Sequence, residues 1–319
     1  MKGLLLCGEN NSKLLPITSS IPKQMLPVAN IPVCEYIVRS MVLSGIRSIG
    51  MVVGDNKSIF SNYFRDGRAY NCRIKYIYQP KPLGTANALM CARDFLDDDD
   101  FLLALGDIYF EEDLSEYIQM FKKEKMDALV LSKRVDNPWQ YGVISVKENR
   151  IMKIVEKPAV TISDLAAIGV YVFRHPILRA CSRIKPSHED GCYNISEAIQ
   201  YLIDRKYRLS YSEIKGEWYH IDNSKKLIEC NNAVNSKFEN GNCIAEDTQL
   251  TNTTIEPGVA IGGRCSIKDS IIRNSVIMDD CIINGVELYD SIVCRGCDIT
   301  GSGKVSGVFG ENTRIFVNA

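Results

Sequence analysis

The sequence predicts an α/β fold in which a large domain with a mixed, mostly parallel sheet precedes a smaller left-handed β-helix. Up to about residue 238, short strand-like apolar runs alternate with stretches of helical periodicity, the pattern of βαβ units with helices on both sheet faces. Beyond that point aliphatic residues recur every five or six positions, a spacing typical of a solenoid. We therefore expect domains at residues 1–238 and 239–319.

Several elements of the first domain can be placed from their patterns. Strands are predicted at residues 3–6, 49–53, 74–78 and 101–105, and helices at 33–44 and 85–95. In Rossmann-like sheets, ligands bind beyond the carboxyl ends of the strands. Gly8, Gln79 and Asp107 each follow a predicted strand, so we expect them to face one cleft.

The C-terminal repeat predicts a β-helix of hexapeptide type, because each short side needs one aliphatic core residue. Its aliphatic positions are Ile244, Leu250, Ile255, Ile261, Ile267, Ile272, Ile277, Ile283, Leu288, Val293, Ile299 and Val305. Cys265, Cys281 and Cys297 recur at similar intervals and are expected to stack as small apolar residues. An acyltransferase role is disfavoured, since all three histidines precede the repeats. We expect the β-helix to serve oligomerisation or regulation.

Composition excludes some classes of partner. The 319 residues carry a formal net charge of -1, which gives no general reason to bind nucleic acid or an anionic membrane. No apolar stretch approaches the ~20 residues needed to span a bilayer. Twelve scattered cysteines without a recognisable signal peptide predict a cytoplasmic protein. The pair Cys294 and Cys297 could begin a zinc site, but no second pair accompanies it, and we favour core packing.

Phosphate chemistry is suggested first by the loop after the first predicted strand. Gly8 allows close backbone approach to phosphates, and Lys13 and Lys23 follow it in sequence. Positive charge is needed where two phosphate groups meet. A glycine with two lysines is a weak motif by itself, and an ordinary β–α turn with solvated lysines would explain it equally well.

Further segments, taken in order, make the pattern specific. They are Leu4–Thr18, Ile21–Asn30, Gln79–Ala86, Leu105–Asp107, Asn137–Val143, Val155–Pro158, Ser163–Phe173, Ile195–Asp204 and Glu229–Asn232. As a set they resemble the sugar-1-phosphate nucleotidylyltransferases over essentially the whole chain. Lys23-Gln24 and Val28-Ala-Asn30, with the repeats, most resemble the long form of glucose-1-phosphate thymidylyltransferase. This resemblance implies a nucleotidyltransferase domain followed by a left-handed β-helix.

The resemblance implies an enzyme of nucleotide-sugar biosynthesis, a transferase dependent on Mg²⁺. Its substrates would be a nucleoside triphosphate, with dTTP or UTP favoured, and a sugar 1-phosphate, with glucose 1-phosphate favoured. Pyrophosphate would be released.

Residue roles follow from the same resemblance. Catalytic charge would come from Lys13 and Lys23, and the metal ligand would be Asp107, with His220 and Asp222 as secondary candidates. The nucleotide would be bound by Gly8, Gln24, Gln79, Gly84 and Thr85. The sugar phosphate would be bound by Tyr141, Gly142, Glu156, Lys157, Tyr171 and Trp218. A carboxylate suits hydroxyl donors and an ammonium suits a phosphate, although Glu156 and Lys157 could also be a surface pair closing a strand.

The sequence departs from the family pattern at positions that carry chemistry. Lys13 stands at an arginine, His220 at a metal-binding aspartate and Asn194 at a glutamate near the sugar. The first loop has Cys7 at a glycine, and Asn10-Asn11 where one glycine is expected. The alternative is therefore a catalytically impaired nucleotide-sugar-binding or regulatory subunit. Either form is expected to be a homo-oligomer, or a hetero-oligomer with a paralogue.

Overall fold

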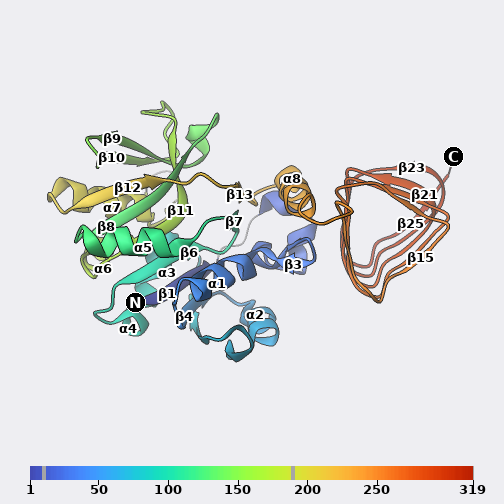
Figure 1. Cartoon of the computed structure of the whole chain (residues 1–319), viewed down its shortest axis with the longest axis horizontal. Helices are drawn as coiled ribbons and strands as arrows, with labels where there is room; N and C mark the ends of the chain where they lie inside the picture. Colours follow the sequence, from blue (N-terminus) through green and yellow to red (C-terminus); the bar gives the residue numbers. More distant parts are fainter. Residues whose placement is uncertain (9–11, 188–190, 319) are drawn as a thin grey trace. The chain divides into compact units, whose positions relative to one another are not determined.

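The computed structural model describes residues 1–8, 12–187 and 191–318, so Asn10 and Asn11 of the first loop lie outside the described residues. The described chain divides into two compact units, residues 1–8 with 36–218 and residues 12–35 with 219–318 (Figure 1). This division groups an N-terminal segment with the C-terminal strands. The division at residue 238 stays a prediction about independently folding domains.

The strands of the first unit are β1 (Lys2–Cys7), β4 (Ser48–Val53), β5 (Arg73–Tyr78), β6 (Phe101–Leu105), β7 (Ile108–Phe110), β8 (Ala128–Arg134), β9 (Gly142–Lys147), β10 (Arg150–Glu156), β11 (Leu165–Phe173) and β12 (Leu209–Glu213). Strand β13 (Trp218–His220) crosses the boundary between the units. The helices are α1 (Val33–Leu43, which begins in the second unit), α2 (Lys57–Phe64), α3 (Thr85–Cys91), α4 (Arg93–Leu96), α5 (Leu114–Lys123), α6 (Pro176–Cys181) and α7 (Ile195–Asp204).

One mixed sheet organises the first unit, in the order β5-β4-β1-β6-β11-β8-β12-β10-β9. Strands β5, β4, β1 and β6 are parallel to one another, whereas β11 pairs antiparallel with both β6 and β8. The predicted mixed α/β sheet is therefore confirmed; β8 and β12 also pair in parallel, and β10 pairs antiparallel with β12 and β9. Helices connect these parallel strands because a parallel pair needs a crossover.

Both faces of the sheet are buried along its central strands, including β1, β4 and β11, as their uninterrupted apolar runs predict. Leu4 and Leu6 of β1 join a core with helices α3, α6 and α7. Leu5, which points to the other face because strand side chains alternate, is also fully buried. The helix predicted at 85–95 is wrong in one detail: it is two helices, because Ala92 adopts φ −89° and ψ 2°. After the break, the ring of Phe95 packs directly against Gly50 of β4, in the space that a side chain at position 50 would fill.

The second unit contains the 3₁₀ turns η1 (Ser12–Leu14), η2 (Ile17–Ser19) and η3 (Lys23–Met25), the short strands β2 (Pro27–Val28) and β3 (Ile31–Pro32), and α8 (Ser224–Asn235). Its remaining strands are β14 (Cys243–Ile244), β15 (Gln249–Thr251), β16 (Thr254–Ile255), β17 (Ala260–Ile261), β18 (Ser266–Lys268), β19 (Ile271–Arg273), β20 (Val276–Ile277), β21 (Ile282–Tyr289), β22 (Ile292–Val293), β23 (Asp298–Val305), β24 (Val308–Phe309) and β25 (Arg314–Val317).

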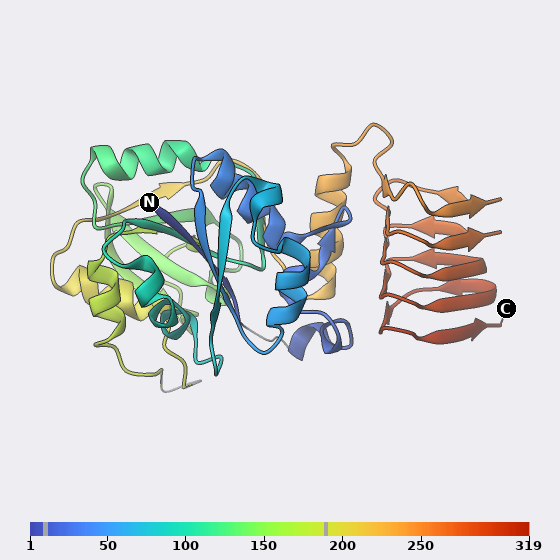
Figure 2. The same cartoon turned by 90° about the horizontal axis from the view of Figure 1, so that it is seen from below.

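These C-terminal strands form a parallel β-helix. Strands β17, β20, β22 and β24 pair in parallel, with Ala260, Val276, Ile292 and Val308 in register, so one coil takes 16 residues. Figure 2 shows the coils stacked on one another. The predicted aliphatic core is buried from Ile261 to Ile299. Ile244 and Leu250 of the first coil are exposed, because no preceding coil covers them.

The predicted cysteine stack is also present. Cys265, Cys281 and Cys297 occupy equivalent positions in successive coils and belong to the buried core of the β-helix. Each thiol donates a hydrogen bond of 3.1 Å to a backbone carbonyl of the next coil. The acceptors are the carbonyl oxygens of Met278, Cys294 and Gly310, in that order. These cysteines therefore behave as core residues, as the repeat predicted.

Candidate functional site

The carboxyl edge of the parallel strands gathers the residues predicted for the nucleotide. Gln79 follows β5 and its N–H donates to Val53 O at the end of β4. The N–H of Gly106, beside Asp107, donates to Leu6 O in β1. A Cβ on Gly8 would lie only 2.4 Å from Oε1 of Gln79. Gly8 and Gln79 are thus in direct contact, and a side chain at position 8 would force this amide to shift.

The amide of Gln79 is held in one orientation. The side chain is 5% exposed, and its Nε2 donates to Oδ1 of Asn87 at 2.9 Å and reaches Gly84 O at 3.5 Å. Sequence reasoning missed Asn87, although a polar residue inside the apolar run of α3 was an available signal. Because the amide is buried and oriented, it can present a fixed pattern of donor and acceptor atoms.

Gly84 and Thr85, also predicted for the nucleotide, contact the segment before α7. Gly84 has φ +97°, and a Cβ there would lie 2.6 Å from Tyr193 O. Oγ1 of Thr85 accepts a hydrogen bond from Ile195 N at 2.9 Å. The interactions seen for both residues thus hold this loop in place.

A second group lies where β9 begins and β10 ends. Gly142 of β9 pairs with Glu156 of β10, and a Cβ on Gly142 would lie 3.2 Å from Oε2 of Glu156 and 3.0 Å from Oγ of Ser196. The Ser196 hydroxyl donates to Oε2 of Glu156 at 2.5 Å. Sequence reasoning missed Ser196, because a serine in the first turn of a helix is usually taken as part of the helix start.

Lys157 lies directly beyond this carboxylate. Its N–H donates to Tyr141 O at 3.0 Å, its φ is +39° and its side chain is exposed. The rings of Tyr141 and Trp218 meet edge to face with centroids 5.2 Å apart, and Nε1 of Trp218 donates to Ile168 O. The structure therefore brings together a carboxylate, an exposed ammonium and an aromatic pair.

Tyr171 belongs to the interior rather than to an open wall. It is 4% exposed and stacks on Phe173 with centroids 5.5 Å apart. Burial, followed by the negative charge of Glu156, raises the pKa of its phenol. The phenol is therefore neutral at physiological pH, and the charge of Glu156 acts on it.

The remaining predicted residues belong to the second unit. Lys13 in η1 is exposed, whereas Lys23 and Gln24 in η3 are buried. Asp222 N donates to His220 O, and Oδ1 of Asp222 accepts from Nδ2 of Asn223 at 2.8 Å. Among the residues that the structure describes, no three His, Cys, Asp or Glu side chains are gathered as metal ligands.

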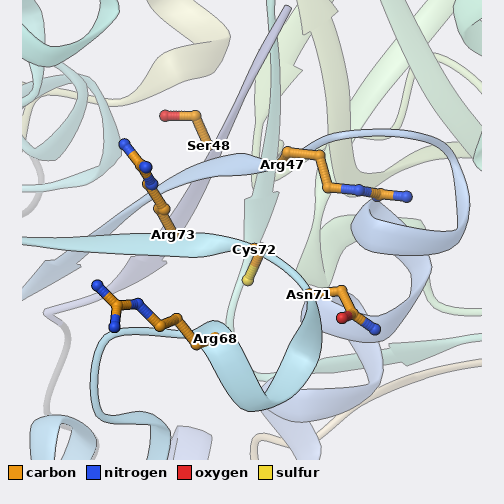
Figure 3. Close-up of a pocket in the computed structure, with 6 residues that line it drawn as sticks. All are labelled: Arg47, Ser48, Arg68, Asn71, Cys72 and Arg73. Atoms are coloured by element: carbon orange, nitrogen blue, oxygen red, sulfur yellow. The ribbon is translucent and has the colours of Figure 1, made fainter.

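A shallow pocket of about 560 Å³ lies elsewhere on the first unit, lined by Arg47, Ser48, Arg68, Asn71, Cys72 and Arg73 (Figure 3). It is found where β4 and β5 begin, at the opposite ends of the strands from Gln79. Arg47 donates to Val42 O and Ile46 O, and Arg68 pairs with Asp66. These interactions are local, and the pocket is separate from the candidate site. Among the described helices, each is too short or too polar to cross a bilayer.

Known proteins resemble the chain along most of its length. A glucose-1-phosphate thymidylyltransferase of Streptomyces griseus is 30% identical, with 100% of both chains covered. A low-salt glycan biosynthesis nucleotidyltransferase of Haloferax volcanii is 32% identical, covering 99% of this chain and 98% of its own.

Solved structures agree. A Bacillus anthracis protein assigned as a glucose-1-phosphate thymidylyltransferase, in complex with sucrose, superposes with a TM-score of 0.70 at 29% identity, covering 75% of this chain and 96% of its own. A UDP-glucose pyrophosphorylase complexed with UDP-glucose gives 0.67 at 25% identity, covering 74% and 99%. The model of the family described as Nucleotidyl transferase matches residues 2–237. This match and these relatives agree with the sheet and with the acidic residue at the end of β10, and the chain belongs to the Nucleotidyl transferase family.

Proposed function

We propose that the protein joins a nucleoside triphosphate to a sugar 1-phosphate and releases pyrophosphate. An oxygen of the sugar phosphate attacks the α-phosphorus, the bond between this phosphorus and the α,β-bridging oxygen breaks, and pyrophosphate leaves with the electron pair. Relatives named for glucose 1-phosphate and thymidylyl transfer favour glucose 1-phosphate with dTTP or UTP. Such a product feeds nucleotide-sugar biosynthesis.

The observation that carries this proposal is that the first unit contains two groups of side chains suited to the two substrates. One is the buried, oriented amide of Gln79 beside Gly8, and the other is Glu156 with the exposed Lys157. The first group suits a base edge because an amide both donates and accepts. The second suits a sugar phosphate, since the carboxylate accepts from hydroxyls and the ammonium attracts phosphate.

The phosphates need positive charge where the two anionic substrates meet. We assign this role to Lys13 and Lys23, with Gln24 beside Lys23 serving the nucleotide. Lysine supplies a point charge where an arginine would supply a planar fork of donors, so orientation of the phosphates depends more on backbone N–H groups and on the metal. Tyr141 and Trp218 would form the sugar wall, with Tyr171 supporting it from the interior.

The donor set fits a magnesium ion only in part. Asp107 is 3% exposed at the end of β6, and Mg²⁺ is commonly held by one or two carboxylates with substrate phosphates completing the shell. His220 offers nitrogen, which suits Mg²⁺ poorly, and one oxygen of Asp222 already accepts from Asn223. We therefore assign the ion to Asp107. When bound, it would offset the negative charge of the triphosphate.

Three further assignments accompany this function. Sixteen residues per coil give five to six per side, which favours a left-handed β-helix of hexapeptide type. We propose that this β-helix makes the protein an oligomer, either of one chain or with a paralogue. The twelve cysteines are free thiols, which favours a reducing compartment such as the cytoplasm.

The direct test is pyrophosphate release by the purified protein with dTTP, glucose 1-phosphate and Mg²⁺, repeated with UTP, ATP and GTP. Lys157→Ala should raise KM for glucose 1-phosphate by about tenfold, because a charge-assisted hydrogen bond is lost. Lys153→Ala is the matched control, since Lys153 is an exposed lysine of β10, the strand directly before Lys157. No release with any common triphosphate and sugar phosphate would overturn the catalytic proposal.

His220 and the engaged oxygen of Asp222 favour one alternative, a nucleotide-sugar-binding or regulatory subunit without turnover. This alternative predicts that dTDP-glucose or UDP-glucose raises the melting temperature while no pyrophosphate appears. The double variant Lys13→Arg, His220→Asp should then gain activity. Loss of an existing activity in that variant would instead indicate residues adapted to their own chemistry.

A further inference from the structure

The carboxylate of Glu156 is held from outside its own strand. The hydroxyl of Ser196, which is 2% exposed, donates to Oε2 of Glu156 at 2.5 Å. A charge-assisted bond of this kind is strong and directional. It comes from the first turn of α7, a helix with no other predicted role in substrate binding.

One turn further along α7, Gln200 holds the same strand. Its Oε1 accepts a hydrogen bond from Ile154 N at 2.9 Å, two residues before Glu156. The pairing of β10 with β9 shifts register between Ile151 and Lys153 and is regular from there to Glu156. Ser196 and Gln200 are four residues apart and so share one helix face. Helix α7 therefore fixes both the backbone and the carboxylate at the end of β10.

The residues around the start of α7 also bond to residues 83–86, the segment proposed to contact the nucleotide and called here the nucleotide-side segment. Tyr193 N donates to Leu83 O and Tyr193 O accepts from Ala86 N, both at 2.8 Å. Ile195 N donates to Oγ1 of Thr85. Gly84 lies so close to the backbone of Tyr193 that no side chain would fit between them. Residues 193–196 are thus bonded to residues 83–86 on one side and to Glu156 on the other.

We propose that residues 193–196 are a bridge that sets the distance between the nucleotide-side segment and the sugar-side carboxylate, with Ser196 as a positioning residue for Glu156. The inference rests on the proposed function. Two substrates react only when held within a fraction of an ångström of the productive geometry. A bridge of backbone bonds and one hydroxyl provides this alignment.

Steady-state kinetics of Ser196→Ala test the sugar side. We expect KM for glucose 1-phosphate to rise about tenfold, because Glu156 loses one charge-assisted bond, while KM for dTTP stays within twofold. Ser132→Ala is the matched control: Ser132 is also fully buried and its hydroxyl donates to Ser212 O in β12. Equal changes in both KM values, or the same change in the control, would overturn the role of Ser196.

Thr85→Val tests the nucleotide side of the bridge. This variant keeps the side-chain shape but removes the acceptor for Ile195 N, so we expect both KM values to rise. The double variant with Ser196→Ala should change kcat/KM by less than the product of the single effects, since both act on one element. Strictly multiplicative effects would contradict a bridge.

Hydrogen exchange gives a readout that does not depend on turnover. Ser196→Ala should speed amide exchange at residues 155–157, whereas Ser132→Ala should leave these amides unchanged. If the wild-type protein releases no pyrophosphate with any substrate pair, the proposed function fails while this measurement still decides the bridge. Unchanged exchange at residues 155–157 would refute it.

Discussion

At the scale of single residues, two glycines of the site are required by neighbours far away in the sequence. A Cβ atom at Gly8 would clash with Oε1 of Gln79, and one at Gly84 would clash with the backbone of Tyr193. The first contact lies against the amide that we propose for base recognition, and the second holds the loop against the segment that precedes α7. Each glycine looks like an ordinary turn residue in the sequence, because the atom that excludes a side chain is supplied by another segment.

The contact between Gly8 and Gln79 predicts an effect on nucleotide affinity. In Gly8→Ala the new methyl group would meet Oε1 of Gln79 at 2.4 Å, so the amide must shift and the bond to Asn87 weakens. We expect KM for dTTP to rise about tenfold, the value of one lost hydrogen bond. The control is Gly54→Ala, where the nearest atom is 3.6 Å away. Equal KM values in the two variants would argue against this role of Gly8.

Buried thiols predict how stability depends on pH. Burial raises the pKa of Cys181 from its ordinary value of 9.0 to about 12. Since the folded state keeps its proton longer than the unfolded chain, the stabilisation is complete below pH 9 and is lost as pH rises from 9 towards 12. Denaturant unfolding between pH 8 and 11 should show Cys181 contributing a fall of about 1.4 kcal/mol per pH unit above pH 9.

The comparison variant for this prediction is Cys181→Ala. Its stability at pH 8 should be lower because a core side chain is shortened, but its decline with pH should be less steep by the contribution of one thiol. The same decline in both proteins would show that Cys181 ionises normally in the folded state.

At the scale of elements, hydroxyl groups at one corner of the β-helix connect successive coils. Ser291 N donates to Oγ of Ser275, and Gly307 N donates to Oγ of Ser291, each at 3.1 Å. Both serines are fully buried, so these backbone N–H groups are shielded from water. Two successive coils thus each depend on a serine hydroxyl of the preceding coil for a backbone hydrogen bond.

Removing one such hydroxyl should destabilise the β-helix. Ser275→Ala deprives Ser291 N of its acceptor inside the core, and an unsatisfied buried donor costs about 1–3 kcal/mol. Ser266→Ala is the matched control, because Ser266 lies in the same β-helix but is exposed; its effect should stay within about 0.5 kcal/mol. Denaturant unfolding measures the loss of stability in both variants. Equal losses would contradict the role of the Ser275 hydroxyl in connecting the coils.

At the scale of the whole molecule, the second unit joins an N-terminal segment to the C-terminal coils. Nδ2 of Asn30 donates to Ile261 O at 2.7 Å and to Cys243 O at 3.1 Å. Ala29 N donates to Oδ1 of Asn231 in α8 at 3.0 Å. The segment that carries Lys23 and Gln24 is therefore anchored by residues more than 200 positions later in the chain.

This anchoring predicts that the first coils stabilise the segment that we propose to bind the nucleotide. A chain ending at residue 238 loses both carbonyl partners of Asn30, so we expect a lower melting temperature and weaker dTTP binding than for the full chain. A chain ending at residue 310 keeps these partners and serves as the control. Thermal unfolding and calorimetric titration with dTTP measure both effects. Similar losses in the two truncations would refute the anchoring role.

Periodicity was sufficient for the architecture. The alternation of strand and helix patterns, and then the five-to-six-residue repeat, specify the α/β sheet and the β-helix, because burying one apolar face leaves few arrangements for either pattern. Strand-end positions likewise predict one shared edge for Gly8, Gln79 and Asp107, since parallel strands bring their carboxyl ends together, and Gly8 and Gln79 are in contact there. The resemblance then supplied Glu156 and Lys157.

Only the tertiary structure decided how these residues are supported. Asn87, Ser196 and the close approach of Tyr193 to Gly84 depend on atoms from segments that no local pattern relates. The grouping of residues 12–35 with the C-terminal strands has the same origin. Periodicity reports which face of an element is buried, but hydrogen-bond partners are set by how elements pack, and that information is distributed over the whole chain.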